Sequence, residues 1–242
     1  MCNDENFWLT RLLNKEVYPL EEIRDFKGDF TYKEMYRHLF LNEYEQGIFE
    51  AVKRNNPYYY KVVSRGHFNS DRKRKIFQDA IKYNSFDVIT YLLIQTESDS
   101  EKLDLEDEIY LSLNEKTVNW YLNMGLGNYA VYIMQLSRYR AEFADYVYEQ
   151  FKKYLPYIKY EHIEVFKEVA DNLGGAIATY TEDEDIEVFS KLEKIIDLFL
   201  QYVRKEDKPI IIKQILHGTE DYNYGVDEKF LKLWQKFLQD KI

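Results

Sequence analysis

The chain has 242 residues, of which 33 are Lys or Arg and 43 are Asp or Glu, for a formal net charge of −10. This acidic balance argues against a nucleic-acid or anionic-membrane footprint, which shows as an excess of basic residues. The sequence contains one cysteine, Cys2, which excludes an intramolecular disulfide and a thiolate metal cage. Hydrophobic residues make up 45%, which is enough to bury a sizeable core.

We expect no targeting signal at the N-terminus. Asp4 and Glu5 stand where a signal peptide has a basic segment followed by an apolar one. The longest apolar stretches, 88–94 and 210–212, fall well short of the ~20 residues that span a bilayer. We therefore expect a soluble, cytoplasmic protein.

Helical spacing of apolar residues begins near the N-terminus. Trp8 and Leu12 are four residues apart, which predicts that they share a face of a first helix. Asn3 or Asp4 can cap this helix, and Pro19 marks its end.

A second helix is predicted after a turn at 26–29. Thr31 can cap it, and Glu34 completes a capping box. Large apolar and aromatic side chains at helical spacing give this helix a buried face. We assign both helices to one N-terminal segment, 1–46.

From Gly47 the pattern changes to short helical units separated by Asn-rich turns. The first helices of these units start at Ile48, Ile76 and Ile109, and corresponding positions of the second helices are Val63, Leu93 and Leu122. Both series recur at intervals close to 30 residues. A helix–turn–helix unit of this period is typical of stacked α-repeats, so we assign repeats to 47–126.

The repeat weakens after Gly125, although helical periodicity continues through 127–242. Helices are predicted over 129–136, 143–155, 162–173, 189–203 and 210–216. Gly-Leu-Gly at 125–127 predicts a helix end, and Gly-Gly at 174–175 predicts a break between two helices. Asp227 can cap a final amphipathic helix that closes the end of the repeats.

No group of residues has the spacing of an active site. The four histidines, His38, His67, His162 and His217, are far apart and lack metal-ligand spacing, which favours surface or helix-end positions. The acidic runs 99–108 and 182–185 lie in polar, turn-like segments, which favours solvated loops over paired catalytic carboxylates. We therefore predict a non-enzymatic protein without metal or cofactor.

The dense basic run is Arg-Lys-Arg-Lys at 72–75. Such a run can bind nucleic acid or act as a nuclear import signal. Its position just before the helix at Ile76 favours a solvated loop between repeats. One tetrad does not outweigh a net charge of −10, so we predict no nucleic-acid partner.

Tyrosine is abundant, with 23 residues, either because coding DNA rich in A and T yields it or because it forms a binding surface. Tyrosine combines a large contact area with a polar tip, which suits protein recognition, although some of these rings must pack between repeats. The predicted partner-binding residues are Tyr58, Tyr59, Tyr60, Tyr83 and Trp120.

Two segments resemble known families. Residues 80–93, AIKYNSFDVITYLL, resemble the middle of an ankyrin repeat, and residues 114–122, NEKTVNWYL, resemble its second half. The Thr-Pro-Leu-His opening of that repeat is missing from every unit, so the repeats are degenerate. The resemblance implies an all-α, ankyrin-like solenoid that binds proteins, and a different α-solenoid is the alternative.

The N-terminal segment resembles the tail of an F-box and the stretch after it. The resemblance is carried by CNDENFWLTRLL at 2–13 and by TYKEMYRHLF at 31–40, where Tyr32 replaces a commoner Trp. This pairing of an F-box tail with ankyrin-like repeats is similar to uncharacterised proteins of large (giant) DNA viruses. It implies the Skp adaptor of an SCF-type ubiquitin ligase as a candidate partner, in the host cell cytoplasm.

The expected fold is therefore all-α, with an N-terminal helical pair, ankyrin-like repeats and a C-terminal capping helix. The expected function is a non-enzymatic interaction module that binds a host or viral protein, with a ubiquitin-ligase substrate adaptor as one form of that role. A structural component of a virus particle or another assembly is the alternative. An enzyme of unrecognised type is the third hypothesis.

Overall fold

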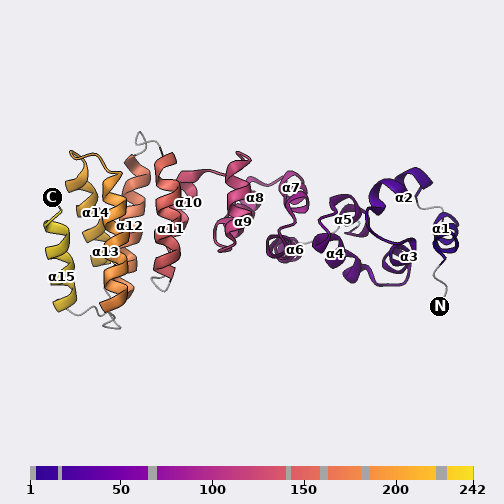
Figure 1. Cartoon of the computed structure of the whole chain (residues 1–242), viewed down its shortest axis with the longest axis horizontal. Helices are drawn as coiled ribbons and strands as arrows, with labels where there is room; N and C mark the ends of the chain where they lie inside the picture. The colour runs from indigo at the N-terminus through magenta and orange to yellow at the C-terminus, as the bar shows by residue number, and fades with distance from the viewer. Residues whose placement is uncertain are drawn as a thin grey trace. The chain divides into compact units, whose positions relative to one another are not determined.

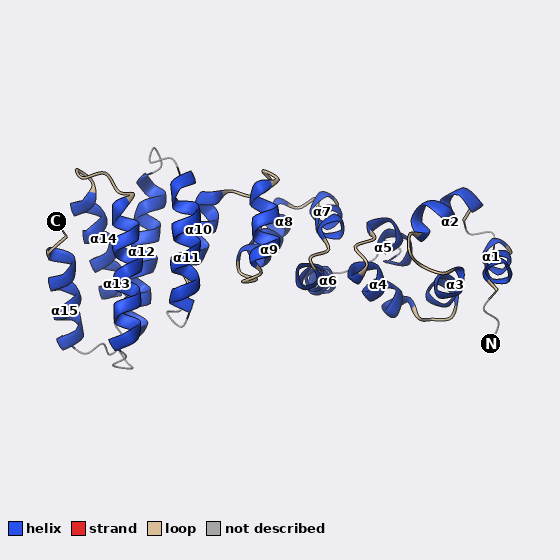
Figure 2. Ribbon diagram, viewed as in Figure 1, coloured by secondary structure: helices blue, strands red, loops and turns tan. Residues whose placement is uncertain are grey.

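The computed structural model describes residues 4–15, 18–64, 70–139, 143–158, 163–180, 186–221 and 228–241. Every regular element in these ranges is a helix, as Figure 2 shows, which confirms the all-α class. The chain divides into two compact units, Met1–Trp120 and Tyr121–Ile242. Within the described ranges no helix is both long and apolar enough to cross a membrane.

The first unit starts with three helices, α1 (Glu5–Leu13), α2 (Leu20–Lys27) and α3 (Tyr32–Phe40). Asp4 caps α1, because its carboxylate accepts hydrogen bonds from the backbone N–H groups of Asn6 and Phe7. The capping box of Thr31 and Glu34 is confirmed. Helix α1 packs on α3.

The sequence-based boundary of the first helix was wrong, because α1 ends at Leu13 and Pro19 precedes a separate helix. Proline lacks a backbone N–H, and this loss costs nothing at the start of a helix. Pro19 is the N-cap residue of α2, which lies over 20–27 where no helix was expected. Helix α2 packs on a later helix of the same unit, α5 (Pro57–Ser64).

After α3 the helices follow one another as three successive pairs, and the last helix of the third pair continues past Trp120 into the second unit (Figure 1). Their helices are α4 (Tyr44–Lys53), α5 (Pro57–Ser64), α6 (Ser70–Tyr83), α7 (Phe86–Ile94), α8 (Asp99–Tyr110) and α9 (Glu115–Asn123). Helices α4 and α5, and likewise α6 and α7, pack within a pair. Between pairs, α4 packs on α6, α5 on α7 and α6 on α8.

One left-handed residue forms the turn inside each pair. Asn55, Asn84 and Leu113 have positive φ angles of 52°, 55° and 55°, and they follow one another at a spacing of 29 residues. Asparagine tolerates this conformation, and it lets the chain reverse after the first helix. The Asn-rich turns of the sequence are thus the points where the first two pairs fold back, and Leu113 takes this position in the third.

Hydrogen bonds tie each pair to the one before it. The Asn55 side chain accepts from the backbone N–H of Asp87 at 2.8 Å and donates to the Asp87 carboxylate at 2.8 Å. One pair later, the Asn114 amide donates to the backbone carbonyl of Ile81 at 2.8 Å. These contacts join residues about one repeat apart, so they fix the register of neighbouring pairs.

The second unit contains longer helices, with the chain folding back and forth (Figure 1). They are α10 (Tyr129–Ser137), α11 (Ala144–Tyr154), the short 3-10 helix η2 (Leu155–Tyr157), α12 (Ile163–Tyr180), α13 (Ile186–Gln201), α14 (Lys208–Asp221) and α15 (Glu228–Gln239). Helix α10 packs on α12, α11 on α13, and α12 on α14. Trp234 of α15 is buried and lies 4.3 Å from the Phe189 ring of α13, so the apolar side of the predicted final helix packs inward. Its predicted cap, Asp227, lies outside the described residues.

The predicted break at Gly174 and Gly175 is wrong, since α12 runs without interruption from Ile163 to Tyr180. Gly174 instead lets α14 approach closely. A Cβ at Gly174 would lie 2.2 Å from the backbone oxygen of Ile215, and one at Gly218 would lie 2.3 Å from that of Asp171. The backbones of α12 and α14 therefore touch. The helix end predicted at 125–127 is confirmed, because α9 ends at Asn123 and Gly125 has a φ of 69°.

Candidate protein-binding groove

The five predicted partner-binding residues differ widely in exposure. Tyr58 has 70% of its surface exposed, whereas Tyr59 and Tyr60 have 0% and 2%. Tyr83 is half-buried beside Phe49, with ring centroids 5.6 Å apart. Trp120 is half-buried and stacks on Phe86 at 4.6 Å. Of these residues, Tyr58 is therefore the one whose ring is mostly free to meet a partner.

Tyr59 and Tyr60 are core residues, so their prediction as partner contacts is corrected. The Tyr59 ring lies 4.0 Å from the Phe30 ring, and its hydroxyl is 2.8 Å from Nδ1 of His38. Burial raises the pKa of both phenols well above the usual range. Consecutive residues of a helix point about 100° apart, so three tyrosines in a row cannot share one exposed face.

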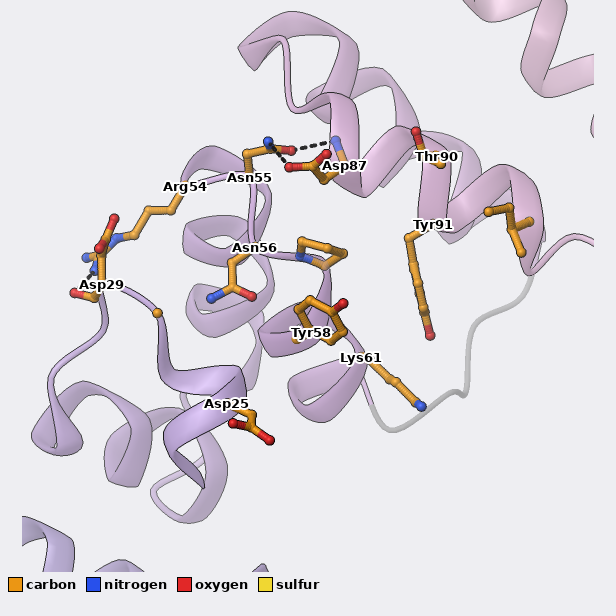
Figure 3. A pocket seen from close by; sticks show the side chains of 13 residues that line it. Asp25, Asp29, Arg54, Asn55, Asn56, Tyr58, Lys61, Asp87, Thr90 and Tyr91 are labelled. Carbon is orange, nitrogen blue, oxygen red and sulfur yellow. Dashed lines mark hydrogen bonds between the residues drawn. The ribbon is translucent and has the colours of Figure 1, made fainter. Parts of the chain in front are cut away.

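A groove of about 620 Å³ surrounds Tyr58 (Figure 3). Its sides come from three places: the end of α2, the turn and first residues of α5, and the outer face of α7. Its charged and aromatic lining residues are Asp25, Asp29, Arg54, Tyr58, Lys61, Asp87 and Tyr91. A second hollow, lined by Tyr18, Glu22, Phe26 and Val62, shares Asp25, Tyr58 and Lys61 with the groove, so the two are continuous.

Asn55 and Asn56 line the groove, and their side-chain amides form hydrogen bonds within the protein. Asn56 caps α5 by accepting from the Tyr59 backbone N–H at 2.9 Å, and it donates to the carbonyl of Phe26 at 3.1 Å. Asn55 caps α7 from the neighbouring pair. These bonds hold α2, α5 and α7 in place without any ligand.

Arg54 also lines the groove, but its charge is balanced inside the protein. Its guanidinium pairs with Glu34 at 2.9 Å and Glu50 at 3.4 Å, and it lies 4.2 Å above the Phe30 ring. Burial lowers the pKa of Arg54, but these two carboxylates outweigh that effect and raise it above its usual value. Arg54 therefore fixes the turn and adds little positive charge to the groove.

The groups left to face a ligand are an aromatic ring, an ammonium and several carboxylates. Asp25, Asp29 and Asp87 are exposed, as is Lys61. Tyr91 is half-buried, and desolvation raises the pKa of its phenol. This set on an open groove offers surface for non-covalent recognition. Nothing in the spacing of the sequence pointed to Asp25, Asp29 or Lys61, because helices far apart in the chain bring them to one place.

The basic run at 72–75 belongs to α6, so the prediction of a loop there is wrong. Three of its side chains form ion pairs with neighbouring helices: Arg72 with Glu45, Lys73 with Glu101 at 3.1 Å, and Arg74 with Glu108. The first partner lies on α4 and the other two on α8. Placed between acidic neighbours, the run links adjacent helix pairs.

The other candidate residues for chemistry do not converge within the described parts of the chain. His38 is buried, and His217 lies 3.6 Å from Asp171. His67, His162 and the acids 182–185 lie outside the described residues. The acids 99–108 form most of α8, so the loop predicted there is wrong. In the ranges that the structure describes, no three His, Cys, Asp or Glu residues are placed to hold a metal ion.

The structure thus defines an all-helical protein with packed helix pairs and an open groove on its first unit. Comparisons of this chain with protein-family models, with curated proteins and with solved structures give no match.

Proposed function

We propose that this chain is a non-enzymatic interaction module that binds a protein partner at the groove around Tyr58. The observation that carries the proposal is the 70% exposure of Tyr58 inside a groove of three helices. Large aromatic rings are costly to leave in water and are frequent anchors of protein interfaces. A ring that the core does not use suits contact with another molecule.

The helix pairs are proposed to be ankyrin-like repeats. Two features support this: left-handed turn residues spaced by 29 residues, and side-chain bonds from each turn to the neighbouring pair. Repeats of this kind contact their neighbours along one direction and present extended surfaces that bind other proteins. Helices α5 and α7, which line the groove, belong to successive pairs, and this supports assigning the groove to such a surface.

The partner is proposed to be a host or viral protein, on the resemblance to giant-virus proteins, with the Skp adaptor as one named candidate. That candidate would turn the chain into a substrate adaptor of a ubiquitin ligase. It makes a distinct prediction, because the adaptor and its cullin would be captured together. The alternative, a structural component of a particle, predicts self-association in place of a separate partner.

A capture experiment with a single substitution tests the proposal. The tagged full chain and its Tyr58→Ala variant are incubated with host-cell extract, and the retained proteins are compared by quantitative mass spectrometry. Tyr58→Ala is expected to lose at least one specific protein by about tenfold, because it removes the central ring of the groove. Its thermal unfolding should match that of the parent, since the ring is exposed.

Tyr157→Ala is the matched control. Tyr157 has 63% exposure, similar to Tyr58, but it lies in the second unit beside Tyr129. It should retain the same proteins as the parent. If all three proteins capture the same set in equal amounts, Tyr58 is not an anchor and the proposal fails. Recovery of the chain alone, as a large self-assembly that Tyr58→Ala leaves intact, would favour the structural alternative.

A further inference from the structure

The groove carries an excess of negative charge among the groups that face solvent. Asp25, Asp29 and Asp87 are exposed carboxylates of its lining, and Glu22 extends the series into the adjoining hollow. Lys61 opposes them with one positive charge. Arg54 does not change this balance, because Glu34 and Glu50 neutralise it.

These carboxylates stand on different sides of Tyr58. Asp25 lies in the last turn of α2, Asp29 follows the end of that helix, and Asp87 comes from the first turn of α7 (Figure 3). Among the described residues, the carboxylates of Asp25 and Asp29 form no ion pair, and the contact of Arg54 with Asp29 is a hydrogen bond of 3.2 Å to its backbone carbonyl. Asp87 accepts a hydrogen bond from the Asn55 amide, a group that carries no opposing charge. A ligand that crosses the groove passes from one acidic edge, over an aromatic ring, to another.

We propose that the groove binds an extended basic segment of the partner protein, with an arginine or lysine side chain over the Tyr58 ring. This inference rests on the proposed function and names the chemistry of its partner. An exposed phenol ring attracts a cation to its face, and arginine also stacks on it as a plane. Carboxylates beside the ring accept hydrogen bonds from the same or a neighbouring cation.

The same arrangement recurs within the protein itself. Arg54 lies over the Phe30 ring and pairs with Glu34, and Arg72 lies 5.6 Å from the Tyr44 centroid while it pairs with Glu45. In both places one guanidinium contacts an aromatic ring and forms an ion pair with a carboxylate at the same time. At Tyr58 the ring and the carboxylates are present, and the partner would supply the cation.

Apolar surface next to the acids indicates which other side chains the bound segment carries. Ile94, which lines the groove on α7, is 72% exposed. A side chain next to the basic one can cover it, and the Lys61 ammonium can donate to a backbone carbonyl of the segment. The recognised segment therefore combines basic residues with an apolar one.

The test is a selection from a random library of short peptides displayed on phage, with the full chain as bait. Arg and Lys are expected to be enriched and Asp and Glu depleted among the selected peptides. A selected peptide, made with a fluorescein label, is then measured by fluorescence anisotropy. The double variant Asp25→Asn/Asp29→Asn should weaken its binding about tenfold, and added salt should weaken binding to the parent.

The control variant changes the net charge by the same amount elsewhere. Glu97→Gln/Asp104→Asn neutralises two exposed acids of the first unit that do not line the groove, and it should bind like the parent. Selected peptides that are acidic or purely apolar, and that lose binding in Tyr58→Ala, would overturn the basic segment and leave the interaction module standing. A selection without binders would also overturn the inference, while capture from extract would still decide the proposed function separately.

Discussion

His38 is a buried side chain of α3 that contacts α5, with its Nδ1 2.8 Å from the Tyr59 hydroxyl. Burial lowers the pKa of His38, and the positive charge of Arg37 lowers it further. Glu34, Glu43 and Glu50 act in the opposite direction without overcoming burial. The folded protein therefore keeps this imidazole neutral at a pH where the unfolded chain already takes up a proton.

From this sign we predict that the first unit loses stability as the pH falls through about 6.5, the ordinary histidine value. The unfolded state binds more protons in that range, so the free energy of unfolding decreases on acidification. His38→Gln keeps a polar partner for Tyr59 and removes the titration, so its urea midpoint should change less between about pH 7 and pH 5.5. Equal changes in the two proteins would show that another group controls this range.

For the tyrosines at 58–60, the sequence indicates the chemistry of each side chain but not whether the side chain is exposed. Their type indicated contact surface, but the environment of each ring depends on the direction in which its helix position points. Tyr59 and Tyr60 point toward Phe30 and Tyr91, so they support the groove from behind. Which of three identical neighbours is exposed depends on the packing of α2 and α7 around α5, and this was not readable from local sequence.

At the scale of elements, the turns within the helix pairs depend on one left-handed residue each. Asn occupies this position in two pairs, whereas Leu113 occupies it in the third with a φ of 55°. A left-handed conformation strains leucine more than asparagine. We predict that Leu113→Asn stabilises the first unit by about 1 kcal/mol. Measured urea midpoints that stay equal or fall would contradict the role assigned to this turn.

The contact of α12 with α14 gives a second prediction for an element. Replacing glycine by alanine at a solvent-exposed position inside a helix normally stabilises a protein by about 0.5–1 kcal/mol. Gly174→Ala should instead destabilise the second unit by about 1–3 kcal/mol, because the new Cβ meets the backbone of α14. The sign of the change in thermal midpoint decides between these expectations. An increase would mean that α14 moves away without cost.

Helix positions in the sequence were predicted better than helix partners. The periodicity gave α3, α4, α7, the part of α6 from Ile76 onward and the end of α9, because spacing and caps are local properties. It missed α2 and misread Gly174, since both depend on a neighbour: α2 packs on α5, and the glycine packs on α14. The charged runs were misread for the same reason, because α6 and α8 pair their charges with each other.

For the whole molecule, the composition predicted the all-helical fold class but did not locate the groove. The scarcity of turn-forming residues, with 9 Gly and 4 Pro, fits a chain whose described elements are all helical. The groove consists of residues from 25 to 94, which meet only when the helix pairs stack. Tyr58 was predicted from the sequence as a partner contact, whereas the acidic residues beside it were not.

The central claim is that a partner protein contacts Tyr58, and site-specific photo-cross-linking tests it most directly. The photoreactive p-benzoylphenylalanine is placed at position 58 in one protein and at position 157 in another, and both are irradiated in host-cell extract. We predict a discrete cross-linked protein at position 58 that is absent at position 157 and is displaced by a basic peptide selected on the groove. Identical products at both positions, or none at position 58, would contradict the account.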